Sequence, residues 1–345
     1  MKNKPLQLPG AVDPESIAKR ELRDGSSIPC IGFGTFSAKY PPGEVAEAAD
    51  TALRLGYRML DCAAAYNNEE YIGQVIAGAA RSGINRDGLY ILGKLQNTMH
   101  GFRNVEIACK KSLNDLKLDY LDAYLVHWPV PNALSPDAAM GIYDNNSRPY
   151  VHEEFMDTWR GMEALVRQGL VRSIGVSNIT VAKLKLLLRD AAIAPAINEM
   201  ELHPTFQQEE LFTFSVLNGV LPVAYSPIGS PLRPQRNKMP GDLVDTQDPI
   251  VVRVADAHHM SPAVVCIKWA VQRGQVPVPF SANPTNMLSN LQAVMGSPLS
   301  REEMKALRAV DRNCRLSRGQ GYLWPGATSY RELWEDDPPD HTGGA

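Results

Sequence analysis

An eightfold alternation of short apolar runs with longer amphipathic segments limits what this sequence can fold into. The runs are rich in Val, Ile, Leu and Tyr, as buried strands of a parallel sheet are, and the segments between them have helical spacing. The predicted strands are residues 31–35, 58–63, 89–94, 120–127, 171–177, 195–202, 221–226 and 276–280. The predicted helices are residues 44–55, 69–80, 104–116, 153–167, 181–189, 208–217, 249–259, 262–272 and 285–294. This order is typical of repeated βα units.

Eight βα units in about 265 residues match a closed (β/α)8 TIM barrel, which typically has about 250 residues. We therefore predict one barrel domain for the chain of 345 residues. A doubly wound open sheet is the alternative. It is disfavoured because the only Gly-rich turn, at residues 32–35, lacks the third glycine of a GxGxxG dinucleotide-binding motif.

Three segments interrupt the alternation. Residues 129–152 and 229–248 follow the fourth and seventh strands, at the end of a barrel where long loops normally build a site. Residues 313–345 form a tail, and its aromatic side chains predict that it folds back over the same mouth: Tyr322, Trp324, Tyr330 and Trp334. Residues 1–27 are expected to form an N-terminal extension or hairpin.

Charge and composition exclude several classes of function. A formal net charge of -3 provides no bulk positive field for nucleic acid or an anionic membrane surface. No run of about 18 apolar residues could span a bilayer, and no signal-peptide run follows the N-terminus, so we expect a cytoplasmic protein. The five cysteines are widely spaced and form no CxxC pair, which indicates reduced thiols and no structural metal.

Four polar side chains stand near the ends of three consecutive predicted strands. Asp61 lies near the end of the second strand, Tyr66 follows in the loop, Lys94 ends the third strand and His127 ends the fourth. A packed barrel end has little use for charge unless such groups converge on one site. We therefore predict that these four residues face one mouth of the barrel.

An Asp, a Lys and a Tyr brought together suit proton transfer. Asp61 would neutralise a buried Lys94, and the ammonium would lower the pKa of Tyr66 from about 10 so that the phenol acts as a general acid and base. His127 could hydrogen-bond a substrate oxygen. Singly, an Asp–Lys pair could be structural neutralisation and a histidine a satisfied core group, so the prediction depends on all four together.

At these residues the chain resembles an aldo-keto reductase, from roughly residue 28 to residue 312. The matching stretches are IGFGTF at 31–36, GYRMLDCA at 56–63, LNDLKLDYLD at 113–122, LVHWP at 125–129, IGVSN at 174–178, ELHP at 201–204 and AYSP at 224–227. The family's catalytic Asp, Tyr, Lys and His fall on Asp61, Tyr66, Lys94 and His127.

The resemblance implies a nicotinamide cofactor lying extended across the barrel mouth and exchanging a hydride with a carbonyl carbon, while Tyr66 donates or removes a proton. It implies that Ser177 and Asn178 hold the carboxamide, that Tyr225 stacks on the ring, and that the loop after the seventh strand lines the pyrophosphate. The implied cofactor-binding positions are Thr35, Phe36, Asp61, Ser177, Asn178, Glu199, Tyr225, Ser226, Ile228, Ser230, Phe280, Ser281, Asn286 and Asn290. The expected substrate walls are Phe36, Trp128 and Trp324. The substrate would be a small aldehyde, ketone, alcohol or sugar, and the expected state is a monomer.

The sequence departs from the family pattern at the far end of the cofactor. The resemblance implies a Lys and an Arg that grip the 2'-phosphate of NADP, but Phe280 and Asn286 occupy those positions. Losing two charge-assisted contacts of about 1.5–3 kcal/mol each would cost NADP about two to four orders of magnitude in preference. We therefore predict NAD(H) as the better cofactor.

The loop after the seventh strand departs as well. Leu232 stands where the resemblance implies an Asp that closes the loop over the cofactor. The alternative to NAD(H) is an ordinary NADPH-dependent reductase whose phosphate contact has moved to a basic residue of this loop: Arg233, Arg236 or Lys238. A second alternative is a regulatory subunit that binds cofactor without turnover, which the four intact catalytic residues oppose.

Glu199 stands where the resemblance implies a Gln that faces the carboxamide. An ionised Glu can accept a hydrogen bond from an amide but cannot donate one. Its charge would also favour the cationic, oxidised cofactor. We therefore hypothesise that Glu199 biases the protein toward binding NAD+ and oxidising an alcohol.

Overall fold

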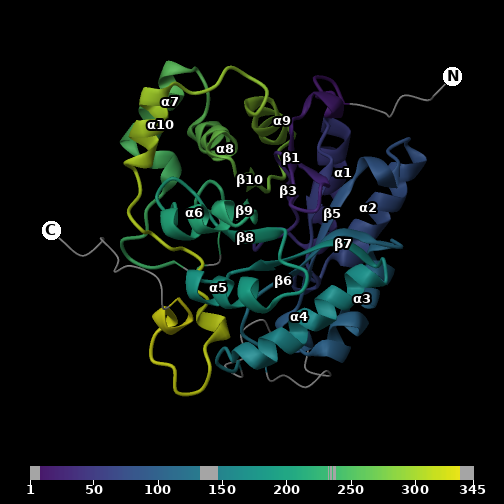
Figure 1. Ribbon diagram of the computed structural model, residues 1–345. Helices are drawn as coiled ribbons and strands as arrows, with labels where there is room; N and C mark the ends of the chain where they lie inside the picture. Colours follow the sequence, from purple (N-terminus) through teal and green to yellow (C-terminus); the bar gives the residue numbers. More distant parts are fainter. Residues whose placement is uncertain (1–7, 133–146, 232, 234, 236–237, 335–345) are drawn as a thin grey trace.

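An eight-stranded parallel sheet forms the centre of the computed structural model, which describes residues 8–132, 147–231, 233, 235 and 238–334 (Figure 1). In these residues the strand order is β10-β9-β8-β7-β6-β5-β4-β3, and each neighbouring pair is parallel. The strands are β3 (Phe33–Gly34), β4 (Met59–Asp61), β5 (Tyr90–Leu95), β6 (Leu121–Val126), β7 (Val171–Ser177), β8 (Ile197–Glu201), β9 (Leu221–Tyr225) and β10 (Val276–Pro277).

Backbone hydrogen bonds also join the first and last strands of this sheet. Gly32 N donates to Pro277 O at 3.0 Å and Gly34 N donates to Pro279 O at 3.0 Å. A Cβ at position 34 would lie 2.7 Å from Val278 O, so only glycine permits this close approach. These contacts close the sheet, and the predicted (β/α)8 barrel is confirmed.

Helices surround the sheet (Figure 1). They are α1 (Pro42–Leu55), α2 (Glu69–Arg81), α3 (Phe102–Leu116), α4 (His152–Arg167), α5 (Val181–Asp190), α6 (Glu209–Leu217), α7 (Pro249–Ala257), α8 (Pro262–Arg273), α9 (Pro284–Ala293) and α10 (Arg301–Arg308). α10 was not among the predicted helices, although Ser300 and Glu303 form a capping box at its start. The other helices lie within two residues of their predicted bounds.

An antiparallel hairpin of β1 (Lys19–Glu21) and β2 (Ser27–Pro29) precedes the barrel. Leu22 and Ile28 of this hairpin belong to one buried cluster with barrel residues such as Met59, Leu92 and Val276. The hairpin therefore packs against the interior of the barrel. The predicted N-terminal segment is a hairpin, and it extends two residues beyond the expected limit of residue 27.

The C-terminal tail packs on the loop that follows β6. Trp128 and Val130 form a buried cluster with Leu333 and Trp334, and Tyr322 lies 4.3 Å from Trp128 between ring centroids. This confirms that the aromatic residues fold the tail back onto the barrel.

All five cysteines are buried and free, as the sequence predicts. Within the described residues, no single helix is long and apolar enough to cross a membrane. α7 and α8 together meet that length and composition, with a bend of 91° between them.

Candidate active site

Lys94 connects the predicted catalytic side chains at the carboxyl ends of the strands. It lies on β5, and its ammonium forms an ion pair with Asp61 at the end of β4. The ammonium also donates to the hydroxyl of Tyr66 at 3.2 Å and to Cys62 O at 3.3 Å. Tyr66 ends a short 3-10 helix, η2 (Ala64–Tyr66), directly after β4. The structure therefore brings together three of the four predicted residues around one buried charge.

The electrostatics of this group differ in one respect from the sequence-based expectation. Burial disfavours the Lys94 ammonium, but the charges of Asp61 and Glu199 outweigh burial and hold the pKa of Lys94 well above its ordinary value. Burial also raises the pKa of Tyr66, and the lowering by Lys94 does not offset it. The expectation of a lowered Tyr66 pKa is therefore wrong for this structure, because desolvation of the phenolate outweighs one neighbouring ammonium.

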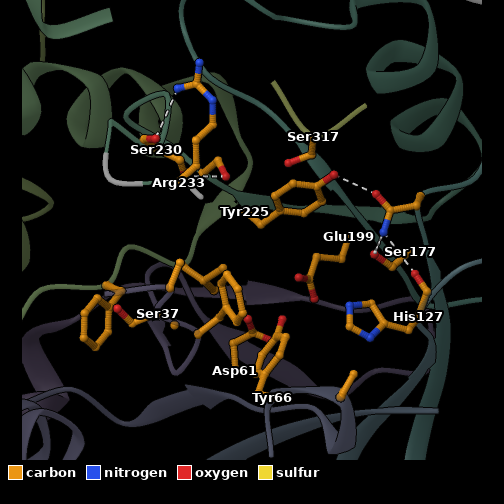
Figure 2. Close-up of a pocket in the computed structure, with 18 of the residues that line it drawn as sticks. Ser37, Asp61, Tyr66, His127, Ser177, Glu199, Tyr225, Ser230, Arg233 and Ser317 are labelled. Atoms are coloured by element: carbon orange, nitrogen blue, oxygen red, sulfur yellow. Dashed lines mark hydrogen bonds between the residues drawn. The ribbon is translucent and has the colours of Figure 1, made fainter. Parts of the chain in front are cut away.

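His127 directly follows β6 and faces the ring of Tyr66, with ring centroids 5.8 Å apart in an edge-on arrangement. Burial and the nearby Lys94 ammonium lower the pKa of His127 to about 3, so the imidazole is neutral at physiological pH. Its Nδ1 is buried and has no hydrogen-bond partner in the described part of the chain. His127 therefore presents a neutral ring next to the phenol (Figure 2).

A hydrogen-bonded pair joins the ends of β7 and β9 above these groups. The hydroxyl of Tyr225 donates to Asn178 Oδ1 at 2.7 Å. Asn178 Nδ2 donates to His127 O and to Ser177 Oγ, both at 3.0 Å. Asn178 has a φ of 56°, in the left-handed region that Asn tolerates. The bonds therefore fix the orientation of the Asn178 amide and of the Tyr225 ring.

Glu199 lies on β8 and is 1% exposed. Its Oε1 lies 3.3 Å from Lys94 Nζ, so it is a second carboxylate on the same ammonium. Burial raises the pKa of Glu199 to about 8, helped by Asp61 and opposed by Lys94. The family resemblance places Glu199 near the cofactor, but the sequence does not indicate its contact with Lys94, because only the closed barrel brings β5 and β8 face to face.

The turn after β9 carries the next predicted positions. Ser230 donates through its hydroxyl to Ser226 Oγ at 2.6 Å, and both residues have positive φ. Arg233 continues from this turn and donates to Ser230 O at 3.3 Å (Figure 2). Its guanidinium also forms an ion pair with Asp242. A cation is therefore fixed beside two serine hydroxyls.

Most of these groups line one pocket of about 320 Å³, whereas Lys94 is fully buried and is not among the lining residues. The predicted residues along it are Phe36, Asp61, Tyr66, His127, Trp128, Ser177, Asn178, Glu199, Tyr225, Ser226, Ile228, Ser230 and Phe280. The pocket also contains residues that sequence analysis did not single out, including Ser37 and, from the tail, Ser317, Gln320 and Tyr322. The only sequence signal for the tail residues was its aromatic content, which predicted contact with the mouth without naming the contacting side chains.

Other predicted positions lie away from the pocket wall. Thr35 is fully buried. Its hydroxyl donates to Asp61 O at 2.7 Å, and this bond holds the backbone at the end of β4. Trp324 packs in the cluster around Trp128, and Tyr322 takes the expected place of Trp324 on the pocket wall. Ser281, Asn286 and Asn290 lie beyond this pocket. Leu232 and Arg236 lie outside the described residues.

A family model described as the aldo/keto reductase family matches residues 30–312. The chain belongs to the aldo/keto reductase family. An aldo/keto reductase of Synechocystis sp. is 39% identical over 317 residues, which are 91% of this chain and 95% of the relative. Aldo-keto reductase family 1 member A1-A of Danio rerio is 38% identical over 298 residues, which are 86% of this chain and 90% of the relative.

Solved aldo-keto reductases have the same fold. An aldo-keto reductase of Bombyx mori, solved in complex with NADP, has a TM-score of 0.79 and 30% identity, and covers 96% of this chain and 100% of its own. An aldo/keto reductase of Brucella melitensis has a TM-score of 0.72 and 31% identity, and covers 86% of this chain and 100% of its own. As a member of the family, this protein is a nicotinamide-dependent oxidoreductase.

The pocket of this aldo/keto reductase fits a nicotinamide cofactor on structural grounds. Glu199 Oε2 is buried and has no hydrogen-bond partner within the described ranges, although the residue lines the pocket. The Tyr225 ring offers a flat aromatic face beside it, and the Ser226 and Ser230 hydroxyls lie further along the same pocket. Polar groups for an amide, an aromatic face for a ring and hydroxyls for phosphate oxygens therefore follow one another along the pocket.

Proposed function

We propose that this protein catalyses reversible hydride transfer between a nicotinamide cofactor and a small carbonyl or alcohol, with Tyr66 as the general acid and base. The supporting observation is the buried Lys94 ammonium, which contacts Asp61 and the Tyr66 hydroxyl at once. A buried lysine that donates to a phenol stabilises the phenolate formed when the phenol gives up its proton.

Each side chain has a defined task in this proposal. The bound nicotinamide supplies the hydride in reduction and accepts it in oxidation. His127 donates a hydrogen bond to the substrate oxygen as a neutral imidazole, and Tyr66 transfers its proton to that oxygen as negative charge develops there. Lys94 then stabilises the phenolate. In alcohol oxidation, Tyr66 accepts the alcohol proton instead.

Aromatic side chains define the substrate end of the pocket. Trp128 is 7% exposed and packs against Tyr322 of the tail, whereas Phe36 is 45% exposed. Phe36 also lies beside Tyr66, with ring centroids 5.1 Å apart. These walls suit an aldehyde, a ketone or the apolar face of a sugar.

NAD(H) is the proposed cofactor. The Phe280 ring, three residues after β10, packs between Phe33 and Tyr40 at centroid distances of 5.7 and 5.9 Å and provides no cation there. Asn286 is exposed and neutral. The 2'-phosphate of NADP would therefore meet no positive charge at these two positions. We expect kcat/KM with NADH to exceed that with NADPH by at least tenfold, and a tenfold preference for NADPH would contradict the proposal.

A specific observation favours NADP(H) as the second candidate. Arg233 lines the pocket, and the Bombyx mori relative was solved with NADP. If Arg233 holds the 2'-phosphate, Arg233→Gln should weaken NADPH binding about ten- to a hundredfold more than NADH binding. Equal weakening of both cofactors would point to a pyrophosphate contact and leave NAD(H) favoured.

The reaction is tested with a panel of aldehydes and ketones with NADH, and of alcohols and sugars with NAD+, followed at the NADH absorbance band. Turnover of at least one class in both directions is expected. Cofactor binding without turnover across the whole panel would contradict the enzymatic proposal and would fit a regulatory subunit.

A further inference from the structure

Lys94 has more acceptors around it than protons to donate. Its ammonium carries three N–H groups. Four oxygens lie within reach: those of Asp61 and Glu199, the Tyr66 hydroxyl and Cys62 O. The distances from Nζ to the Tyr66 hydroxyl and to Glu199 Oε1 are 3.2 and 3.3 Å. Lys94 therefore joins Tyr66 to Glu199 by two contacts of nearly equal length.

The charges of this group do not balance when both carboxylates are ionised. Asp61, Glu199 and Lys94 then carry one net negative charge in a buried site, and a Tyr66 phenolate would add a second. The groups that interact with Glu199 are Lys94 from β5, Asp61 from β4, Tyr66 from η2 and Tyr225 from β9. The neutral His127, directly after β6, interacts with Lys94. Lys94 is the only cation among them, so a proton on Glu199 makes the site neutral while Tyr66 is a phenol and limits it to one net negative charge when Tyr66 is a phenolate.

The two oxygens of Glu199 face different surroundings. Oε1 contacts Lys94. Oε2 is buried without a hydrogen-bond partner in the described segments, on a residue that lines the pocket. A proton on this carboxyl can therefore pass to Lys94 on one side and be exchanged with the pocket on the other.

We propose that Glu199 returns a proton to Tyr66 through Lys94 after each reduction. The Tyr66 O–H bond breaks as its proton moves to the substrate oxygen. A proton of the Lys94 ammonium then moves to the phenolate, and the Glu199 O–H proton moves to the Lys94 amine. Tyr66 and Lys94 regain their starting forms, and Glu199 is left as a carboxylate. Oxidation runs these steps in reverse and ends with Glu199 protonated.

This inference rests on the proposed reaction and adds a consequence for its pH dependence. Reduction needs Glu199 protonated and oxidation needs it ionised. Because the pKa of Glu199 is about 8, kcat/KM for reduction should fall above this pH and kcat/KM for oxidation should rise through it. On each side of the transition, kcat/KM should change by about tenfold per pH unit. Glu199 touches Lys94 and acts through it, so the pH profile distinguishes this role from simple packing.

The experiment compares wild type with Glu199→Gln, which keeps the shape of the side chain but cannot titrate. The limb near pH 8 is expected to disappear from both profiles of the variant. Glu210→Gln, on the exposed surface of α6, is the matched control and should keep both limbs. Glu199→Asp keeps a carboxyl group and should retain a limb at reduced rate, which covers the case of a Gln variant that does not fold.

A second readout needs no turnover. The oxidised nicotinamide is cationic, so binding of NAD+ near pH 8 should release protons from Glu199. Calorimetric titration of NAD+ in buffers of different ionisation enthalpy should show fractional proton release for wild type and for Glu210→Gln, and none for Glu199→Gln. Identical proton release and identical pH profiles in Glu199→Gln and wild type would overturn the inference. Full turnover by Tyr66→Phe would overturn the proposed reaction itself.

Discussion

Position 229, in the turn after β9, accepts only glycine. Gly229 has a φ of +73°, and a Cβ there would lie 1.9 Å from Asp245 Oδ2. Asp245 cannot retreat freely, because it pairs with the buried His203 and accepts from Thr205 N at 2.8 Å. The turn that carries Ser226 and Ser230 along the pocket is therefore packed against the buried Asp245–His203 ion pair.

Gly229→Ala should consequently lower both stability and cofactor affinity. Gly169→Ala is the matched control, because Gly169 also has a φ of +73° but nothing within 4 Å of its Cβ position. The control should lose about 1 kcal/mol through the left-handed backbone alone, and Gly229→Ala about 2–4 kcal/mol. Chemical denaturation and NADH titration would measure both, and equal losses in the two variants would refute the clash.

Individual residues show how far the sequence could predict the site. Asp61, Lys94 and His127 were predictable because a polar group that ends an apolar strand must face the barrel mouth, and Tyr66 because it follows Asp61 in the loop at the same mouth. The raised pKa of Tyr66 was not, since it depends on how completely the fold excludes water from the phenol. The Tyr225–Asn178 hydrogen bond was also not predictable, because the two residues are 47 positions apart and meet only at the strand ends.

The loop after β9 and the C-terminal tail are joined by Asp242. Its carboxylate forms ion pairs with Arg233 of the loop and with Arg318 of the tail, and all three side chains are at most 10% exposed. Glu201 of β8 anchors the same tail by accepting from Leu316 N at 2.9 Å and Ser317 N at 2.8 Å. The loop after β9 and the tail are therefore both held by the Asp242 carboxylate.

Asp242→Asn should loosen both segments, because it removes the carboxylate charge that the two arginines share. We expect the rate of NADH release to rise about three- to tenfold in stopped-flow fluorescence. Asp256→Asn, on the exposed side of α7, is the control. A release rate that matches the control would show that Asp242 does not hold the loop over the cofactor.

The positions of the helices could be predicted from the sequence, but the contacts between the loop after β9 and the tail could not. Hydrophobic spacing gave nine of the helices, while the short α10 was missed because its Ser300–Glu303 capping signal precedes a segment with little apolar residue content. The long loop and the tail were recognisable as interruptions. Their shared ion pairs were not, because residues 233, 242 and 318 have no common sequence pattern.

The closed barrel fold of the whole molecule follows from the eightfold alternation of strands and helices in the sequence. Parallel strands joined by helices must be covered on both faces, and closure removes the edges that an open sheet would expose. Gly34 permits that closure by leaving room for the backbone of residues 278 and 279, and the backbone N–H groups of Gly32 and Gly34 donate across the seam to Pro277 O and Pro279 O. The barrel then places the ends of β4, β5, β6 and β8 around one buried ammonium, which is why residues far apart in sequence act as one site.

The most direct test of this account is the turnover and cofactor binding of Tyr66→Phe, which removes the proton and leaves the ring. NADH affinity should stay within about twofold of wild type, while kcat for carbonyl reduction should fall about 10²- to 10⁴-fold. Tyr71→Phe, an exposed tyrosine of α2, should change neither quantity. A Tyr66→Phe variant with wild-type kcat would contradict the assignment of Tyr66 as the proton donor.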